Sequence, residues 1–132
     1  MTAIANLVVK NGAATPVDTT FTAVTPSSGF GALAIWQVIA GSARSMYRTF
    51  TASVTRNSAG TTITKTKLVL PSYYTDSVTG LPVLLTQAEV NVDIRVPKDF
   101  PTAELDDLAA FAGNLLTTAL MKDVIKTGTP VT

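Results

Sequence analysis

The stretch Tyr47-Arg-Thr-Phe-Thr-Ala-Ser-Val-Thr-Arg56 alternates apolar and polar side chains with a period of two. Phe50, Ala52 and Val54 fall on one side of it, and hydroxyl-bearing side chains fall on the other. Successive side chains of a β-strand point to opposite faces, so this pattern predicts a strand with one face toward a core. The sequence around it should therefore supply neighbouring strands with the same two faces.

Further strands are indicated on both sides of this stretch. They are expected over residues 7–10, 17–24, 30–39, 61–70 and 87–96. Asn11-Gly12 is typical of a two-residue hairpin turn after the first of them. Pro71 is expected to end the strand 61–70, and a loop is expected from Tyr73 to Pro82.

After Pro97 the apolar period changes from two to 3.6. One helical stripe contains Leu105, Leu108 and Ala112, and a second helix is expected over 115–127, ended by Gly128. Strands followed by two helices predict an α+β fold. No linker composition interrupts the chain, so residues 1–132 are expected to form a single domain.

The composition excludes several classes of protein. Charged residues make up only 14% of the chain and hydrophobic residues 46%, which is the opposite of a disordered protein. The chain has no Cys and no His, so thiol nucleophiles, a Ser-His-Asp triad and imidazole or thiolate metal ligands are excluded. We expect no cofactor, no metal and no enzymatic activity. No signal peptide is indicated, and the longest apolar run, Phe30 to Ala40, is too short to span a bilayer, so no membrane partner is expected.

The net charge of +1 conceals a segregated distribution. Between Asp18 and Asp76 there is no acid, and this part of the chain contains Arg44, Arg48, Arg56, Lys65 and Lys67. Most of the acids lie toward the C-terminus. A basic middle within a neutral total indicates a face for polyanions, and the alternative is a solvated sheet face that lacks acids by chance.

Two catalytic interpretations are weak. The segment Gly29-Phe-Gly31-Ala-Leu-Ala34 matches the GxGxxG/A pattern of dinucleotide-binding proteins. However, a strand-like run follows the glycines, and no acidic residue lies about 20 residues later. These glycines are interpreted as turn residues. Glu89 and Asp93 lie four residues apart on one strand face, about 13 Å along the strand, whereas a glycosidase pair needs about 5–9.5 Å. We interpret them as solvated carboxylates.

The polar face of the central strands favours nucleic-acid binding. Hydroxyls and amides hydrogen-bond phosphates and sugars, and lysines neutralise phosphate. The candidate RNA-binding residues are Thr49, Thr51, Ser53, Thr55, Arg56, Lys65, Lys67, Asn91 and Asp93. No aromatic stacking platform is evident on this face, so the pattern points to polyanion binding more than to sequence-specific recognition.

The order and spacing of several segments carry a resemblance over nearly the whole chain. They are the Asn11-Gly12 hairpin, Ala34-Ile35-Trp36, Ser45-Met46-Tyr47-Arg48, Ser53-Val54-Thr55-Arg56, Lys65 to Pro71, Gly80-Leu81-Pro82-Val83, and Asn91 to Pro97 before two helices. In this layout the chain resembles the coat proteins of the small single-stranded RNA bacteriophages, the levivirus group. The resemblance implies a five-stranded antiparallel sheet behind an N-terminal hairpin, in an interlocked homodimer whose helices cover the partner's sheet.

The resemblance also implies a function. Dimers of such proteins build an icosahedral shell whose polar sheet face packages the single-stranded RNA genome and, in some members, binds an RNA hairpin to repress replicase translation. By position it places Thr51, Ser53, Lys65, Lys67, Asn91 and Asp93 at RNA contacts, and the loop Tyr73 to Pro82 at the symmetry axes of the shell. The expected location is the virion, after assembly in the bacterial cytoplasm.

Two positions depart from the family's pattern. Glu89 stands where some relatives have a tyrosine that stacks on a hairpin base, which places specific repression in doubt. Arg56 is displaced by one residue relative to the family's strand arginine, so both Thr55 and Arg56 remain candidates. An alternative function is a dimeric RNA-binding regulatory module that builds no shell.

Overall fold

The computed structural model describes residues 3–39 and 46–132. Arg44, one of the cations in the acid-free segment, lies outside the described residues. The chain divides into two compact units, Met1–Val96 and Pro97–Thr132, which contain the sheet and the helices respectively. The expectation of a single domain over 1–132 stays a prediction.

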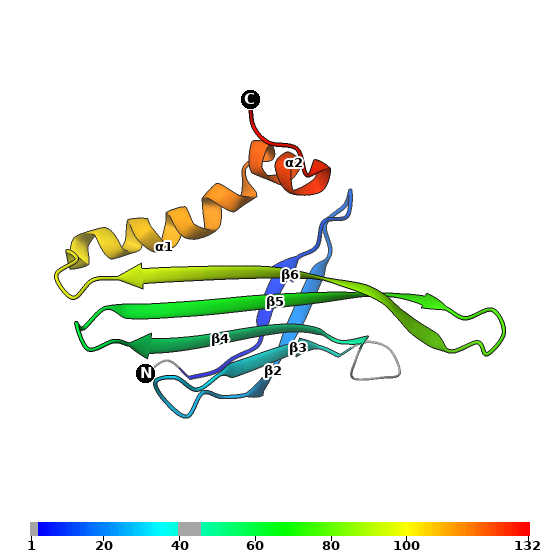
Figure 1. Cartoon of the computed structure of the whole chain (residues 1–132), viewed down its shortest axis with the longest axis horizontal. Helices are drawn as coiled ribbons and strands as arrows, with labels where there is room; N and C mark the ends of the chain where they lie inside the picture. The colour runs from blue at the N-terminus through cyan, green and yellow to red at the C-terminus, as the bar shows by residue number, and fades with distance from the viewer. Residues whose placement is uncertain (1–2, 40–45) are drawn as a thin grey trace. The chain divides into compact units, whose positions relative to one another are not determined.

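The N-terminal unit is one antiparallel sheet whose strands follow each other in chain order (Figure 1). The strands are β1 (Leu7–Lys10), β2 (Asp18–Thr25), β3 (Ala34–Val38), β4 (Arg48–Arg56), β5 (Thr62–Thr75) and β6 (Pro82–Val96). The antiparallel sheet and the N-terminal hairpin are as expected, but the expected number of five strands is wrong, since the sheet has six. The reason is that β2 changes partner along its length: Asp18 to Phe21 pair with β1, and Thr22 to Thr25 pair with β3 through a bulge.

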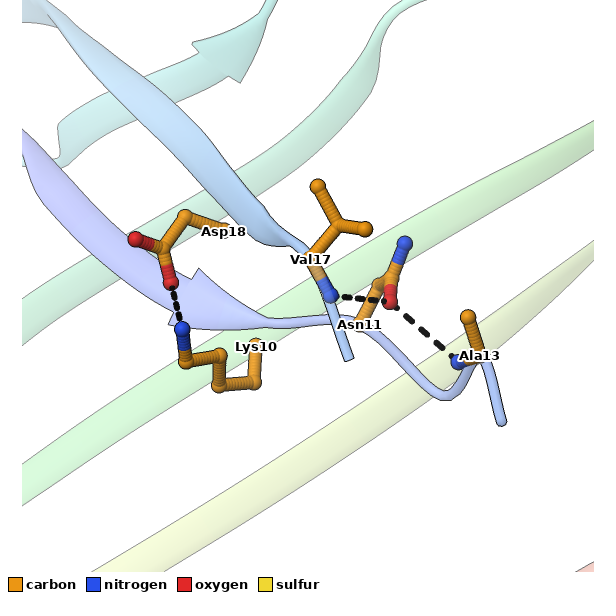
Figure 2. Close-up of polar contacts among 5 residues, drawn as sticks. All are labelled: Lys10, Asn11, Ala13, Val17 and Asp18. Atoms are coloured by element: carbon orange, nitrogen blue, oxygen red, sulfur yellow. Dashed lines mark hydrogen bonds and ion pairs between the residues drawn. The ribbon is translucent and has the colours of Figure 1, made fainter. Parts of the chain in front are cut away.

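The β1–β2 hairpin forms, but its turn is not the two-residue turn expected from Asn11-Gly12. That turn type needs a positive φ at both residues, and within the described chain the only residues with positive φ are other glycines. Residues 11–17 instead make a longer loop that Asn11 organises (Figure 2). Its Oδ1 accepts hydrogen bonds from the backbone N–H groups of Ala13 and Val17, at 3.2 and 3.0 Å. The Lys10–Asp18 ion pair links the two strands at the start of this loop.

The β5–β6 hairpin is longer than its sequence indicates. Pairing continues past Pro71 to Thr75 and Pro82, so Pro71 does not end the strand and the loop is only residues 76–81. Pro71 lies beyond the last β4–β5 pair, at Val69, where β5 has no neighbour on that side, and an unpaired strand edge tolerates the missing N–H. Figure 1 shows this hairpin extending past the start of β4.

Two glycines determine where β3 begins. The strand expected over 30–39 begins only at Ala34, because Gly29 (φ 146°) and Gly31 (φ 84°) adopt turn conformations that L side chains rarely adopt. The Gly31 N–H donates to the Val54 carbonyl at 2.8 Å, which fixes this turn beside β4. The interpretation of these glycines as turn residues is confirmed.

The C-terminal unit contains two α-helices, α1 (Leu105–Asn114) and α2 (Ala119–Thr127), with short 3-10 turns at Thr102–Glu104 and Leu115–Thr117. The Thr118 hydroxyl accepts a hydrogen bond from the Met121 N–H and caps α2, and Gly128 ends it in the left-handed conformation, as expected. No single helix in the described ranges is long and apolar enough to cross a membrane; the bent pair Thr102–Thr117 and Ala119–Thr127 passes on length and composition alone.

Neither unit encloses a core of its own in the described residues. Within residues 3–39 and 46–132, no side chain of any type is fully buried. The nearest approach to a core is a half-buried aromatic cluster in which Phe50 packs against Phe21 and Trp36, with ring centroids 6.5 and 5.6 Å apart. A chain of this size normally encloses a substantial core, and the described residues of neither unit form one.

Candidate nucleic-acid interface

The strand register brings the candidate residues into rows that cross β4, β5 and β6. Paired residues of neighbouring strands point to the same face, so each row is a set of adjacent side chains. Two consecutive rows consist of candidates only: Thr51, Lys67 and Asn91 in one, and Ser53, Lys65 and Asp93 in the next. The structure therefore assembles on one face six candidates whose sequence positions span more than forty residues.

Rows on either side complete this polar face. They are Thr49, Val69 and Glu89 on one side, and Thr55, Ile63 and Arg95 on the other. The four hydroxyl residues of β4 are half-buried, whereas both lysines are exposed. The Thr55 hydroxyl already donates a long hydrogen bond of 3.5 Å to the Ile63 carbonyl. The face therefore presents half-buried hydroxyl groups next to exposed ammonium groups.

This face carries charges of both signs. Lys65 and Lys67 come from β5, and Glu89 and Asp93 come from β6. The Lys67 ammonium lies 3.5 Å from the Glu89 carboxylate, although the two residues are one row apart. Lys65 is directly opposite Asp93, yet among the described residues no carboxylate lies within 4.0 Å of its ammonium. The two lysines therefore have different electrostatic surroundings.

Arg56 is the one candidate that the structure does not place with the others. Along β4 it has the same parity as Phe50 and Val54, so it lies on the apolar face and not with the hydroxyl residues. Its guanidinium lies over the Phe30 ring, 4.9 Å from the ring centroid, which is a cation–π contact. Of the two positions left open by the sequence, only Thr55 belongs to the polar face.

Arg95 belongs to the polar face and was missed by the sequence reasoning about binding. It occupies the row of Thr55 and Ile63, next to the row that contains Asp93. The signal was present, since Arg95 has the same parity as Asn91 and Asp93 along β6. With Arg95, the face has three cations against two carboxylates.

The opposite face of the sheet is apolar and hollowed. A pocket of about 800 Å³ is lined by residues that include Ile4, Phe30, Trp36 and Val54. Two hydrogen bonds hold the segment before β1 along its rim: the Trp36 indole N–H donates to the Ala5 carbonyl at 2.8 Å, and the Ala23 N–H donates to the Asn6 side-chain oxygen at 2.9 Å. The sheet thus offers one polar face and one shaped apolar face.

The helical unit exposes an apolar surface of its own. Large side chains on it are exposed rather than buried: Phe111, Leu115, Leu116, Leu120 and Ile125. An amphipathic helix normally buries its apolar face against another element. The residues expected to form the stripe of the first helix, Leu105, Leu108 and Ala112, are half-buried, and the exposed apolar side chains lie mainly beside them and on α2.

Comparisons with known proteins agree on one family. A family model described as levivirus coat protein matches residues 2–131. The fold is similar to the virus-like particle of bacteriophage NT-214, with a TM-score of 0.87, 25% identity, and coverage of 99% of this chain and 100% of that one.

Two further solved structures have the same fold. For the virus-like particle of Beihai levi-like virus 21 the TM-score is 0.84 at 18% identity, covering 99% of each chain. For the capsid protein of bacteriophage GA the TM-score is 0.75 at 22% identity, covering 96% of this chain and 95% of that one. No curated protein sequence matches the chain.

Proposed function

Because this chain belongs to the levivirus coat protein family, we propose that it forms dimers that build an icosahedral shell around single-stranded RNA. The chain is a structural, non-enzymatic capsid protein of an RNA phage, and its location is the virion. The proposal concerns the steps beyond this: the dimer, the closed shell and the RNA. The observation that carries it is the absence of any fully buried side chain in the described part of a single chain.

The first element of the proposed dimer is the free edge of β6. This strand is fifteen residues long and lies at the end of the sheet, so its outer N–H and C=O groups have no strand partner in the order β1 to β6. Long exposed edges promote association, and antiparallel pairing of two β6 strands about a two-fold axis would satisfy both edges. The two polar faces would then join into one continuous surface.

The second element is the exchange of helices. The apolar pocket lined by Trp36 and Val54 is open to solvent, and the helical unit exposes Phe111, Leu115 and Leu120. These side chains could fill the pocket. We place the helices of each chain over the apolar face of its partner's sheet. Each dimer would then bury two apolar faces and two helical stripes, which supplies the core that a single chain lacks.

The third element is RNA on the polar face. With the apolar face covered by helices, the rows of hydroxyls, amides and lysines are the surface left for the genome. Hydroxyl and amide groups position a phosphate backbone without reading sequence, and lysines supply salt-dependent affinity. Binding of one specific RNA hairpin, with repression of replicase translation, stays a prediction, since Glu89 offers no ring on which a base can stack.

Expression of the chain alone tests the proposal. We expect particles of megadalton size on size-exclusion chromatography, icosahedral shells by electron microscopy, and an absorbance ratio that shows co-purified RNA. A species of dimer size that binds RNA and forms no shell under any condition would favour the alternative, a regulatory RNA-binding module. A monomer without RNA would contradict both functions.

Lys65 provides a second test, aimed at the RNA face. Lys65→Gln is expected to reduce the magnitude of the salt dependence of RNA affinity by about 0.7 in the slope of log K against log salt, the contribution of one phosphate contact in single-stranded RNA. Filter binding of an RNA oligonucleotide at several salt concentrations measures it. Lys98→Gln, a lysine outside the six strands, is the control and should leave the slope unchanged. Equal slopes for wild type and Lys65→Gln would remove this face as the RNA site.

A further inference from the structure

We propose that Glu89 is an internal competitor for RNA: its carboxylate occupies the position beside Lys67 that an RNA phosphate would otherwise take. RNA binding at Lys67 then requires an exchange of one anion for another. This inference rests on the proposed RNA-binding role of the polar face, and it concerns how strongly that face binds. The carrying observation is the 3.5 Å approach of the Lys67 ammonium to the Glu89 carboxylate.

The geometry singles out Glu89 among the neighbours of Lys67. Directly beside Lys67 in its row are Thr51 and Asn91, which are neutral. Glu89 lies one row further along β6, opposite Val69, and the lysine side chain extends toward it. The ammonium is therefore directed at a carboxylate on its own sheet, in preference to the hydroxyl and amide beside it.

The ion pair is open to competition. The Lys67 side chain is 47% exposed and the Glu89 side chain 39% exposed, so solvent and a nucleic acid can reach both groups. Exposed ion pairs are weak, and the free energy that one contributes corresponds to at most about a fivefold change in an equilibrium constant. Glu89 should therefore lower the affinity for RNA by a few fold without preventing binding.

The exchange has a signature in the salt dependence. A phosphate that contacts an unpaired lysine releases condensed counterions, which steepens the dependence of affinity on salt. When the phosphate displaces Glu89, the freed carboxylate attracts a cation from solution, and the net release is close to zero. In the wild-type protein Lys67 should thus contribute affinity with little salt dependence, whereas Lys65, which has no such ion pair among the described residues, contributes a full phosphate equivalent.

Asp93 offers a matched control. It is on the same face and the same strand as Glu89, and it is directly opposite Lys65, but it forms no ion pair within 4.0 Å in the described part of the chain. Asp93→Asn and Glu89→Gln each remove one negative charge from the face. Any general electrostatic effect is common to both, and only Glu89→Gln releases Lys67.

The test is a double-mutant cycle on Glu89 and Lys67. The full-length chain in wild-type, Glu89→Gln, Lys67→Gln and doubly substituted forms, with Asp93→Asn beside them, is titrated with a single-stranded RNA oligonucleotide at several salt concentrations. We expect Glu89→Gln to raise the affinity by up to about fivefold and to steepen the slope by about 0.7. In the Glu89→Gln background, Lys67→Gln should reduce the magnitude of this slope by about 0.7. In the wild-type background, the same Lys67→Gln substitution should leave the slope nearly unchanged.

Each other outcome has a definite meaning. Equal effects of Lys67→Gln in both backgrounds, or equal slopes for Glu89→Gln and Asp93→Asn, would overturn the inference, because no coupling would exist between the two residues. If Lys65→Gln flattens the slope while the cycle shows no coupling, only this inference fails. If none of these substitutions, Lys65→Gln included, alters RNA binding, the proposed RNA face fails together with it.

Discussion

Leu120→Asp is expected to abolish the soluble dimer without leaving a stable monomer in its place. The Leu120 side chain is 60% exposed in a single chain, so its loss should cost little there, but in the proposed dimer it is covered by the partner's sheet. Even removal of a buried leucine to alanine costs about 2–5 kcal/mol, and a two-fold dimer contains each substitution twice. A buried carboxylate adds to that cost, and the total approaches the whole stability of an ordinary protein, about 5–15 kcal/mol.

Denaturant unfolding at several protein concentrations provides the measurement. For the wild-type chain, the midpoint should rise with concentration, because association and folding are one process. Lys122→Asp is the control, since it places the same side chain on an exposed polar position of the same helix and should retain the dimer. A midpoint independent of concentration, or a folded monomer of Leu120→Asp, would show that each chain closes its own core.

Shortening the β5–β6 turn is expected to abolish the shell and preserve the dimer. The tip of this hairpin exposes apolar side chains, with Val78 91% and Leu81 63% exposed, far beyond the last contact with β4. Asp76 holds the turn in shape: its carboxylate accepts from the Val78 N–H at 2.8 Å, and its carbonyl accepts from the Gly80 N–H at 2.8 Å. Such a structured apolar tip is suited to contacts between dimers.

The variant replaces residues 75–82 with Asn-Gly between Tyr74 and Val83, which are already paired and both have a backbone N–H, so that a two-residue turn closes the hairpin. Size-exclusion chromatography and electron microscopy should find dimers without closed shells. Asp76→Asn keeps the accepting oxygen and is the control that should still assemble. Normal shells from the shortened variant would exclude the turn as an assembly contact, and an unfolded variant would make it part of the folding unit.

Much of this protein could be predicted from local pattern. The alternation in β4, β5 and β6 correctly separated an apolar face from a polar one, and the change of period after Pro97 correctly indicated two helices, although the second begins at Ala119 and not at Leu115. Such patterns suffice because the period of two or 3.6 is a property of neighbouring residues alone. The same alternation also held the information that Arg56 and Arg95 lie on opposite faces.

Other expectations failed because they depend on partners distant in sequence. Pro71 does not end β5, since its neighbour β4 stops first, and β2 is shared between two partners, which makes the sheet six-stranded. The Asn11-Gly12 turn fails for a more local reason, because the Asn11 side chain stabilises a longer loop. Turn propensity is a weak preference that tertiary and side-chain hydrogen bonds override.

The sequence by itself therefore determined which side chains share a face, the positions of the helices and the family to which the chain belongs. Only the tertiary structure decided which of those side chains are neighbours. Lys67 and Glu89 are 22 positions apart, and their ion pair exists because the register of β5 against β6 sets Lys67 opposite Asn91. The register of a hairpin depends on the length of its turn as well as on the alternation of its strands, and here the turn is residues 76–81 and not the predicted 73–82.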